Sequence, residues 1–228
     1  MSKDWTKIRA KVKDFIESEI YPKETELAKG TPEAREMLGS LMQLAKDEKI
    51  WALGHPEDIG GGGMPFMEYV YVNEVIGRSS FAMVALGTHS LQDSIMLREF
   101  ASPHWRDQYL EPLVQGEIFP SFGMTEPDVA SSDPTQLQTT AILDNGTWKI
   151  NGTKWFTTGA ARAAYTTVMC RTELDAPSHG AFSMIIVPTD NPGYKIVRET
   201  PVLGINGGHY EVKYDNVEVP EENLLGPR

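Results

Sequence analysis

The sequence turns from helical to strand-like character at one stretch, which reads Phe122-Gly123-Met124-Thr125-Glu126-Pro127-Asp128-Val129-Ala130-Ser131-Ser132-Asp133. This stretch is rich in hydroxyl groups and potential backbone donors, and Pro127 and Pro134 restrict its freedom. Such a loop can surround the polar edge of a ring or a pyrophosphate group. Short motifs often match by chance, so by composition alone a well-capped surface loop is the commoner explanation.

Upstream of this stretch, apolar residues recur at helical spacing. One stripe runs from Ile8 to Ile20 and another from Met37 to Ala45. The first helix is predicted to end near Tyr21-Pro22, because the residue before a proline is pushed out of the helical region. The second is predicted to begin with Thr31 as N-cap and Pro32 in the first turn.

A glycine loop is expected at Gly60 to Gly63, because four successive glycines do not hold a helix. Pro65 then opens another helix, which runs through Val75 and Ile76. A further helix is expected over about 82–100, and a short last one over 103–113.

Downstream of Phe119 the apolar period shortens and turn residues become frequent. A β-hairpin is predicted over 139–150 with its turn at Asp144-Asn145-Gly146, because Asn-Gly takes the positive φ values that tight turns need. Asn151-Gly152 is expected to form a second turn. Strands are then predicted over 154–158, 165–171, 182–187, 194–197 and 210–219.

These patterns predict an α+β protein of two domains. The first is an all-α helical domain over residues 1–118, and the second is an antiparallel, β-barrel-like domain over 119–228. A chain of 228 residues is long enough to build two modest cores. No long linker separates the halves, so we expect them to pack against each other.

Composition excludes several classes of function. The net charge of -11 disfavours a nucleic-acid partner, because phosphate binding needs a basic face. No apolar run approaches the roughly 20 residues of a membrane span. The first residues have neither a secretory nor a transit character, which predicts a cytoplasmic location, or an organelle matrix in a eukaryote.

No metal site is predicted. Cys170 is the only cysteine, and no two histidines have the spacing of metal ligands. Lone histidines such as His89 and His209 are interpreted as structural residues, because that is the commoner role of an isolated histidine on a helix or strand.

Two spaced segments resemble the acyl-CoA dehydrogenase family. Residues 122–127 with the following Ser-Asp resemble the family's flavin loop, and 150–159 resemble its second flavin segment, Ile150-Asn151-Gly152-Thr153-Lys154-Trp155-Phe156-Thr157-Thr158-Gly159. Similarity also extends over 55–61, 105–117 and 215–226. The order and spacing of the family therefore hold over nearly the whole chain.

The resemblance implies FAD as the cofactor. Thr125 and the backbone of 122–125 would meet the pyrimidine side of the isoalloxazine, and Thr158 would place its hydroxyl near flavin N5. Phe156 stands where many relatives have tryptophan beside the ring. The implied cofactor-binding set is Phe122, Met124, Thr125, Ser131, Ser132, Phe156, Thr157 and Thr158, and the implied substrate contacts are Ser131 and Ser132.

One departure from the family pattern concerns the two serines. Relatives commonly have Thr-Glu-Pro-x-x-Gly-Ser-Asp, whereas this loop has Ala130 in place of the glycine and one residue more before Asp133. Either Ser131 or Ser132 can therefore take the contact with the pyrophosphate or the substrate. The longer loop is found in a subgroup linked to long or 4-hydroxylated acyl chains.

The reaction implied by the resemblance is the α,β-dehydrogenation of an acyl-CoA thioester, as in fatty acid β-oxidation. A carboxylate removes the α-proton while the β-hydride passes to flavin N5. In relatives that base is a glutamate on a C-terminal helical bundle, which would begin where this chain ends, so no catalytic residue is expected here and the chain alone is expected to be inactive. The loop carboxylates Glu126, Asp128 and Asp133 are interpreted as residues that fix backbone geometry.

The resemblance also implies an acyl-CoA substrate, an electron-transfer partner, and a homo-oligomer for the full-length protein. Two alternatives remain open. Flavin monooxygenases and acyl-CoA oxidases share the architecture, and fold alone does not decide the reaction. A truncated chain could instead be a non-catalytic module that binds a nucleotide or a partner subunit.

Overall fold

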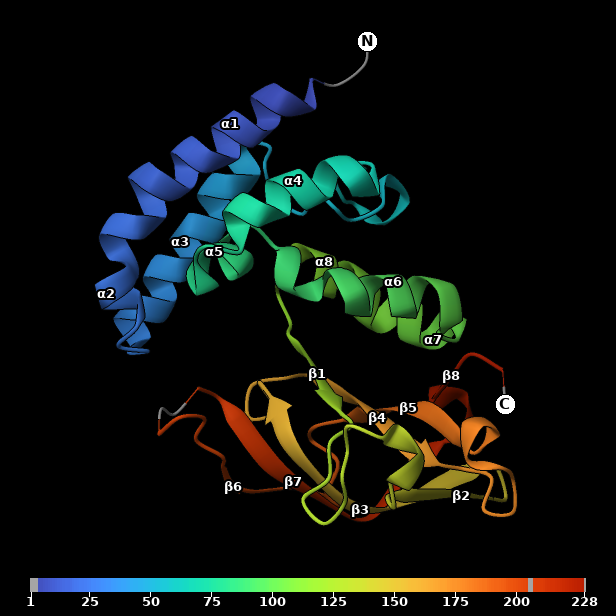
Figure 1. The fold of residues 1–228 in the computed structure, drawn as a ribbon. Coiled ribbons are helices and arrows are strands. Elements are labelled where there is room, and N and C mark those ends of the chain that lie inside the picture. Colours follow the sequence, from blue (N-terminus) through green and yellow to red (C-terminus); the bar gives the residue numbers. More distant parts are fainter. Residues whose placement is uncertain (1–3, 205–206, 228) are drawn as a thin grey trace. The chain divides into compact units, whose positions relative to one another are not determined.

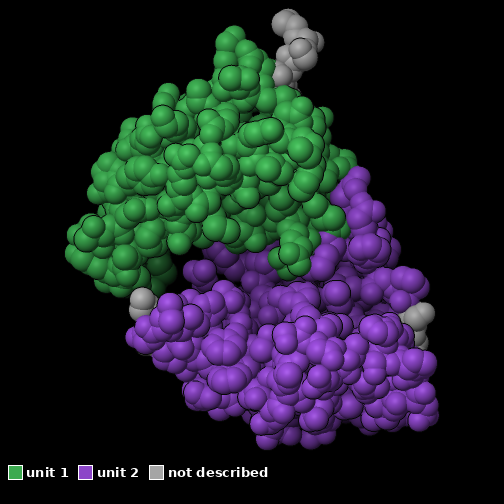
Figure 2. All heavy atoms as spheres, viewed as in Figure 1, with its two compact units in different colours: residues 1–95, 114–116 green, residues 96–113, 117–228 purple. Residues whose placement is uncertain are grey.

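The structure is a computed structural model, and it describes residues 4–204 and 207–227. These residues form two compact units, which have different colours in Figure 2. The first comprises the described residues up to 95 together with 114–116, and the second comprises 96–113 and the described residues from 117 onward. By packing, the segment 96–113 thus belongs with the sheet, while the domain boundary expected after residue 118 stays a prediction.

The first unit is helical (Figure 1). Its α-helices are α1 (Trp5–Phe15), α2 (Glu24–Leu27), α3 (Pro32–Asp47), α4 (Phe66–Ile76), α5 (Ser80–Ala85) and the first half of α6 (Leu91–Phe100). Shorter helical turns are the π-helical Ile16–Ile20 and the 3-10 helices Tyr21–Lys23, Glu57–Ile59 and Thr88–Ser90. Helix α1 packs against α4, and α3 packs against α5, so that their apolar stripes form one buried core.

The start of α3 confirms the predicted cap. The Thr31 hydroxyl accepts a hydrogen bond from the Ala34 N–H at 3.3 Å, and Pro32 occupies the first turn, where it sacrifices no helical hydrogen bond. The predicted end of the first helix is wrong. Helical structure continues past Pro22 to Leu27, because Pro22 lies in the first turn of a new 3-10 helix, a position that needs no N–H donor.

The glycine loop predicted at 60–63 is confirmed. The single helix predicted over 82–100 is wrong, because the chain breaks at Gly87. A Cβ on Gly61 would lie 2.3 Å from the Cβ of His55, so only glycine fits that turn. At Gly87 the backbone φ is +69° and an added Cβ would meet the Trp51 ring at 2.6 Å. The chain therefore breaks there, and the predicted single helix is α5, a 3-10 turn and α6.

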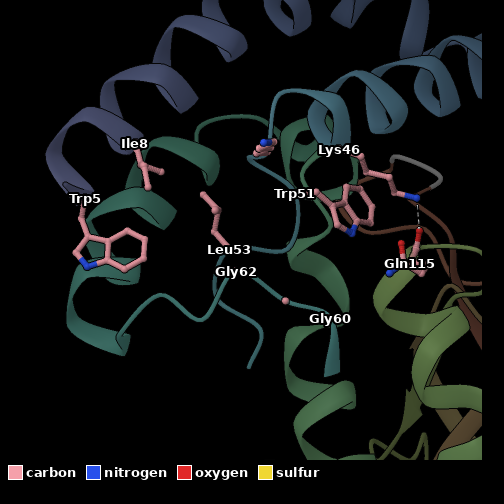
Figure 3. A pocket seen from close by; sticks show the side chains of 10 residues that line it. Trp5, Ile8, Lys46, Trp51, Leu53, Gly60, Gly62 and Gln115 are labelled. Carbon is pink, nitrogen blue, oxygen red and sulfur yellow. Dashed lines mark hydrogen bonds between the residues drawn. The ribbon is translucent and has the colours of Figure 1, made fainter. Parts of the chain in front are cut away.

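Two side chains of the first unit tie down residues 114–116. The Trp51 indole N–H donates to the Val114 carbonyl at 2.9 Å. The Lys46 ammonium donates to the Gln115 carbonyl at 2.8 Å (Figure 3). Lys46 also lies 4.8 Å from the centre of the Trp51 ring. Lys46, Trp51 and Gln115 line a cavity of about 480 Å³ in this unit.

The second unit is built on one sheet. Its strands are β1 (Pro120–Gly123), β2 (Thr140–Asp144), β3 (Thr147–Thr158), β4 (Tyr165–Arg171), β5 (Phe182–Pro188), β6 (Tyr194–Glu199), β7 (His209–Pro220) and β8 (Leu224–Leu225). The helical segments before it are the second half of α6, α7 (Pro103–Trp105), the π-helical Arg106–Leu110 and the first part of α8 (Glu111–Gln115). The 3-10 turns are Pro134–Gln136, Ser178–Gly180 and Glu221–Asn223.

The sheet is open rather than closed into a barrel. Its strand order is β6-β7-β3-β2-β4-β5-β8, so β6 and β8 form its two ends (Figure 1). Most pairs are antiparallel, as predicted, but β1 pairs with β4 in parallel and β2 meets β4 in parallel at one position. Strand β1 was not expected from the sequence, because Ser121 and Gly123 make its period indistinct from the loop that follows.

The hairpin turn at Asp144-Asn145-Gly146 is confirmed, with φ values of +50° and +78° at Asn145 and Gly146. The prediction of a second turn at Asn151-Gly152 is wrong. Strand β3 continues through these residues with a bulge, and a Cβ on Gly152 would lie 2.3 Å from the Thr139 hydroxyl oxygen. Gly152 is needed because the Thr139 side chain lies too close to leave room for a Cβ, and not because the chain reverses direction there.

Aromatic packing explains why residues 96–113 belong with the sheet. The ring of Trp105 stacks on Tyr109 with centroids 5.1 Å apart, and the ring of Tyr109 lies against that of Tyr165 of β4 with centroids 4.8 Å apart.

None of the helices in the described ranges combines the length and apolar character needed to cross a bilayer.

Candidate functional site

The loop that carries most of the predicted site residues leaves the sheet at the end of β1. Phe122 lies on that strand opposite Thr167 of β4, and Met124 and Thr125 follow directly, all three partly exposed. The parallel pairing of β1 with β4 fixes the direction in which the loop departs. The loop is therefore anchored at its start by a ladder of backbone hydrogen bonds.

The two segments predicted to share one ligand lie side by side. The Trp155 N–H donates to the Thr125 carbonyl at 2.7 Å, and the Ser121 hydroxyl donates to the Thr158 carbonyl at 2.8 Å. One bond thus joins the loop to the middle of the second segment, and the other joins β1 to its end. Thr125 and Thr158 belong to one region of the second unit.

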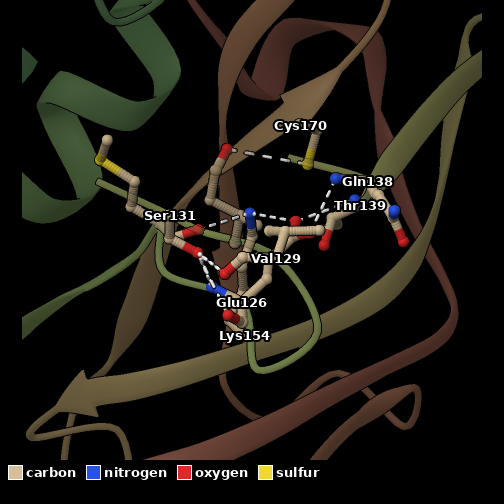
Figure 4. Close-up of polar contacts among 9 residues, drawn as sticks. Glu126, Val129, Ser131, Gln138, Thr139, Lys154 and Cys170 are labelled. Atoms are coloured by element: carbon tan, nitrogen blue, oxygen red, sulfur yellow. Dashed lines mark hydrogen bonds and ion pairs between the residues drawn. The ribbon is translucent and has the colours of Figure 1, made fainter. Parts of the chain in front are cut away.

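A buried ion pair lies behind this junction. Glu126 and Lys154 are 2.9 Å apart, and their side chains are 5% and 0% exposed (Figure 4). The Glu126 carboxylate also accepts from the N–H groups of Gln138 and Thr139, and the Lys154 ammonium also donates to the Met124 carbonyl at 2.9 Å. The pair therefore connects the loop, the two residues just before β2 and strand β3.

The pair stays charged because its hydrogen bonds compensate for burial. Burial by itself raises the pKa of Glu126, but hydrogen bonds from Thr139, Lys154 and Gln138 outweigh it and hold the pKa below its usual value. For Lys154, burial lowers the pKa, and the Glu126 carboxylate opposes that shift. Isolated charges would not persist in such a place, so each partner depends on the other.

The two candidate serines have different surroundings. The Ser131 hydroxyl accepts a hydrogen bond from the Glu126 N–H at 2.8 Å and donates one to the Glu126 carbonyl at 3.1 Å (Figure 4). These two bonds hold residues 126–131 in a closed turn. Ser132 is exposed. Asp133 caps the following 3-10 helix by accepting from the Thr135 N–H, which agrees with the structural role expected for it.

The second segment presents an aromatic surface at a distortion of β3. The pairing of β3 with β7 shifts register between Lys154 and Thr157, and Phe156 has a φ of +52°, which is unusual and costly for a bulky residue. Its ring stacks on Trp155 with centroids 4.5 Å apart and remains 38% exposed. Bulges of this kind redirect a side chain, here toward the outside.

Thr157 and Thr158 point in opposite directions, as successive residues of a strand do. The Thr157 side chain is fully buried, so only its backbone could meet a ligand at the surface. The Thr158 side chain is exposed, and its hydroxyl lies 2.8 Å from Nδ1 of His209 on β7. The sequence alone predicts a lone structural histidine at His209. The pairing of β3 with β7 brings it opposite Thr158 and makes this contact.

These features fit a flat aromatic ligand with a polar edge. They supply an aromatic surface at Phe156 and an exposed hydroxyl at Thr158. The start of the loop adds the partly exposed residues Phe122, Met124 and Thr125. The Trp155 indole N–H is buried with no hydrogen-bond partner among the described residues. Across 4–204 and 207–227, no three His, Cys, Asp or Glu side chains gather as metal ligands, and burial raises the pKa of Cys170 to about 12.

Comparison with known proteins gives matches to both halves of the chain. A family model described as the acyl-CoA dehydrogenase N-terminal domain matches residues 2–117, and one described as the middle domain matches 121–217. The probable acyl-CoA dehydrogenase FadE2 of Mycobacterium tuberculosis is 38% identical over 232 residues, which cover 96% of this chain and 56% of that protein.

Solved structures give the same result. A Mycobacterium abscessus protein assigned as an acyl-CoA dehydrogenase aligns with a TM-score of 0.89 at 33% identity, covering 99% of this chain and 61% of that one. A glutaryl-CoA dehydrogenase from Mycobacterium smegmatis in complex with FADH2 shares the fold, with a TM-score of 0.78 at 24% identity and coverages of 99% and 56%. The chain spans little more than half the length of these relatives.

Proposed function

Since the chain belongs to the acyl-CoA dehydrogenase family, we propose that it forms the flavin-binding part of an enzyme that oxidises an acyl-CoA thioester between its α and β carbons. The observation that carries this proposal is the junction of the two segments. Hydrogen bonds of 2.7 Å from Trp155 to Thr125 and of 2.8 Å from Ser121 to Thr158 support one shared site rather than two separate surfaces.

In this proposal FAD is the cofactor, and when bound it supplies the acceptor for two electrons. The backbone of Phe122, Met124 and Thr125 would hold the pyrimidine side of the ring, and the exposed ring of Phe156 would cover a flat face of it. Thr157 would contribute only through its backbone, because its side chain is buried. Thr158 would direct its hydroxyl to the edge of the ring.

Of the two serines, Ser132 is the better candidate for the pyrophosphate and the substrate thioester. The Ser131 hydroxyl already serves the Glu126 backbone, so Ser131 would act by shaping the loop. Ser132 is exposed on the same loop. Ser132→Ala should weaken ligand binding with little change in stability, whereas Ser131→Ala should lower the melting temperature as well.

We propose that the catalytic base lies outside these residues. Abstraction of an α-proton needs a carboxylate with a raised pKa in an apolar pocket. Glu126 has the opposite character, because Lys154 and two backbone N–H groups hold its pKa below the usual value. The full-length protein would then need a further segment for turnover, as well as an electron-transfer partner and, on the family pattern, a homo-oligomeric state.

The test is an absorbance scan of the purified chain after refolding with excess FAD and removal of the free cofactor. We expect a bound flavin spectrum that shifts when an acyl-CoA is added. A chain that folds but retains no flavin would rule out the site assignment. In the full-length protein, an artificial electron acceptor should support turnover without O₂, and a strict need for O₂ would favour an oxidase or monooxygenase instead.

A further inference from the structure

We infer that His209 is a positioning residue for this site, acting through the Thr158 hydroxyl. Nδ1 of His209 lies 2.8 Å from Oγ1 of Thr158, which is hydrogen-bonding distance. Thr158 is the residue whose hydroxyl would face flavin N5, so this inference rests on the proposed function. It adds a residue that the sequence pattern alone did not connect with the site.

The backbone on both sides of the contact is tied in place. Thr158 and His209 are register partners of β3 and β7, and the Gly159 N–H donates to the Gly208 carbonyl at 2.8 Å. On the far side of β7, the Thr200 N–H donates to the His209 carbonyl at 2.8 Å. The two side chains therefore meet because their strands are paired.

Further hydrogen bonds fix the end of β3 and the approach to β7. The Ser121 hydroxyl donates to the Thr158 carbonyl at 2.8 Å, and the Glu199 carboxylate accepts from the Gly208 N–H at 3.1 Å. Gly207 lies near the imidazole, since a Cβ built on it would lie 3.3 Å from Cδ2 of His209. The 2.8 Å contact with Thr158 is the hydrogen bond that orients the ring.

The contact decides what the Thr158 hydroxyl can offer a ligand. A hydroxyl has one hydrogen and two lone pairs. If Nδ1 of His209 accepts, a lone pair of Thr158 is left for the ligand, and if Nδ1 carries the proton and donates, the hydroxyl hydrogen is left instead. N5 accepts a hydrogen bond in oxidised flavin and carries an N–H in reduced flavin, so His209 biases the balance between the two forms.

Without His209 the hydroxyl has another partner within its own strand. Oγ1 of Thr158 lies 3.4 Å from the Phe156 carbonyl, a longer and weaker contact than the 2.8 Å bond to His209. Removing the imidazole would let the hydroxyl turn toward that carbonyl and away from the ligand. Loss of one such hydrogen bond corresponds to about a tenfold change in the ratio of oxidised to reduced flavin, or about 30 mV for a two-electron couple.

The experiment measures the reduction potential of FAD bound to the 228-residue chain and to four variants, namely His209→Leu, His209→Asn, Thr158→Val and the double variant of Thr158→Val with His209→Leu. His209→Leu should shift the potential by about this amount, and His209→Asn, which keeps a polar atom near the place of Nδ1, should remain close to the wild type. In a chain that already carries Thr158→Val, His209→Leu should cause no further shift, because the two residues act through one hydroxyl. A purely structural histidine would not show this dependence on Thr158.

The outcomes separate the two proposals. If the wild-type chain binds no FAD, the proposed function fails and this inference fails with it. If the wild type binds FAD and His209→Leu has the same potential, or shifts it equally with and without Thr158→Val, only the role of His209 is overturned.

A second measurement needs no flavin. The sequence has five histidines, and the ¹⁵N signals of their rings can be followed by NMR. Thr158→Val should move the ring signals of His209 and leave those of the other histidines in place. Unchanged His209 signals would contradict the contact itself.

Discussion

Two buried groups of the helical unit contrast with one buried pair of the sheet unit. In the helical unit, burial lowers the pKa of the fully buried His55 to about 4, with a further contribution from His89, and burial raises the pKa of Asp93 to about 6. Both shifts favour the neutral form. In the sheet unit, Glu126 and Lys154 are also buried, yet they remain a charged pair.

The difference lies in the partners. Within the described ranges no cation pairs with Asp93, whereas the Glu126 carboxylate receives two backbone N–H groups and an ammonium. Replacing a buried ion pair by apolar residues is often neutral for stability, so such a pair is weak evidence of a stabilising role. Because Glu126 belongs to the first predicted segment and Lys154 to the second, the main effect of the pair is to hold the loop in one conformation.

The largest expected effect comes from removing one partner of the buried pair. Lys154→Met would leave the Glu126 carboxylate buried without its cation and the Met124 carbonyl without a donor. We expect the free energy of unfolding to fall by about 3 to 5 kcal/mol, measured by urea denaturation. The double variant Glu126→Gln with Lys154→Met should recover part of that loss, and equal losses in the two variants would show that the charge is not the cause.

The next effect concerns the loss of stability at low pH that is caused by His55. The unfolded chain takes up a proton on this residue as the pH falls through about 6.5, whereas the folded chain does so only near 4. The free energy of unfolding should therefore fall across this window by about 3 kcal/mol through His55. Urea denaturation at pH 7 and 4.5 checks this, because His55→Leu should remove that part of the pH dependence and an unchanged slope would contradict it.

Asp93 should act in the other direction and somewhat less strongly. Its pKa of about 6 in the folded chain lies above the usual 3.8, so the folded state binds the proton first and gains stability as the pH falls from 6 to 4. Asp93→Asn should stabilise the chain at pH 7 by about 3 kcal/mol and have little effect below pH 4. Thermal unfolding at the two pH values measures this, and a destabilised variant at pH 7 would indicate that the charged carboxylate has a favourable partner.

The smallest effect is expected from an exposed pair in the same sheet. Lys195 and Asp215 are 2.6 Å apart, but their side chains are 53% and 36% exposed. Water and salt screen such pairs, so Lys195→Met should leave the melting temperature and flavin binding close to the wild type. This variant is the matched control for Lys154→Met, and a comparable loss of stability in both would remove the distinction between buried and exposed pairs.

Much of the fold could be predicted from the sequence because local signals were strong. The Thr31 cap, the glycine loop and the Asn145-Gly146 turn each depend on a few adjacent residues. The break at Gly87 and the bulge at Gly152 could not be predicted, since the close approach of Trp51 to Gly87 and of Thr139 to Gly152 appears only in the folded chain.

The candidate site shows the same division. The resemblance pointed to the two segments, but the contacts between side chains do not follow from spacing. Glu126 and Lys154 are 28 residues apart, and Thr158 and His209 are 51 residues apart, so only the folded chain brings each pair together. Alternation along β3 would have distinguished the buried Thr157 from the exposed Thr158, had the bulge before them been foreseen.

The most direct measurement of the central claim follows threonine methyl groups by NMR while FAD is added to the chain. We expect the signals of Thr125 and Thr158 to move together with one saturation curve, because both would lie against the same ring, while the signal of Thr31 in the helical unit stays in place. Movement of only one of the two, or movement at different FAD concentrations, would contradict a single flavin site at the junction of β1 and β3.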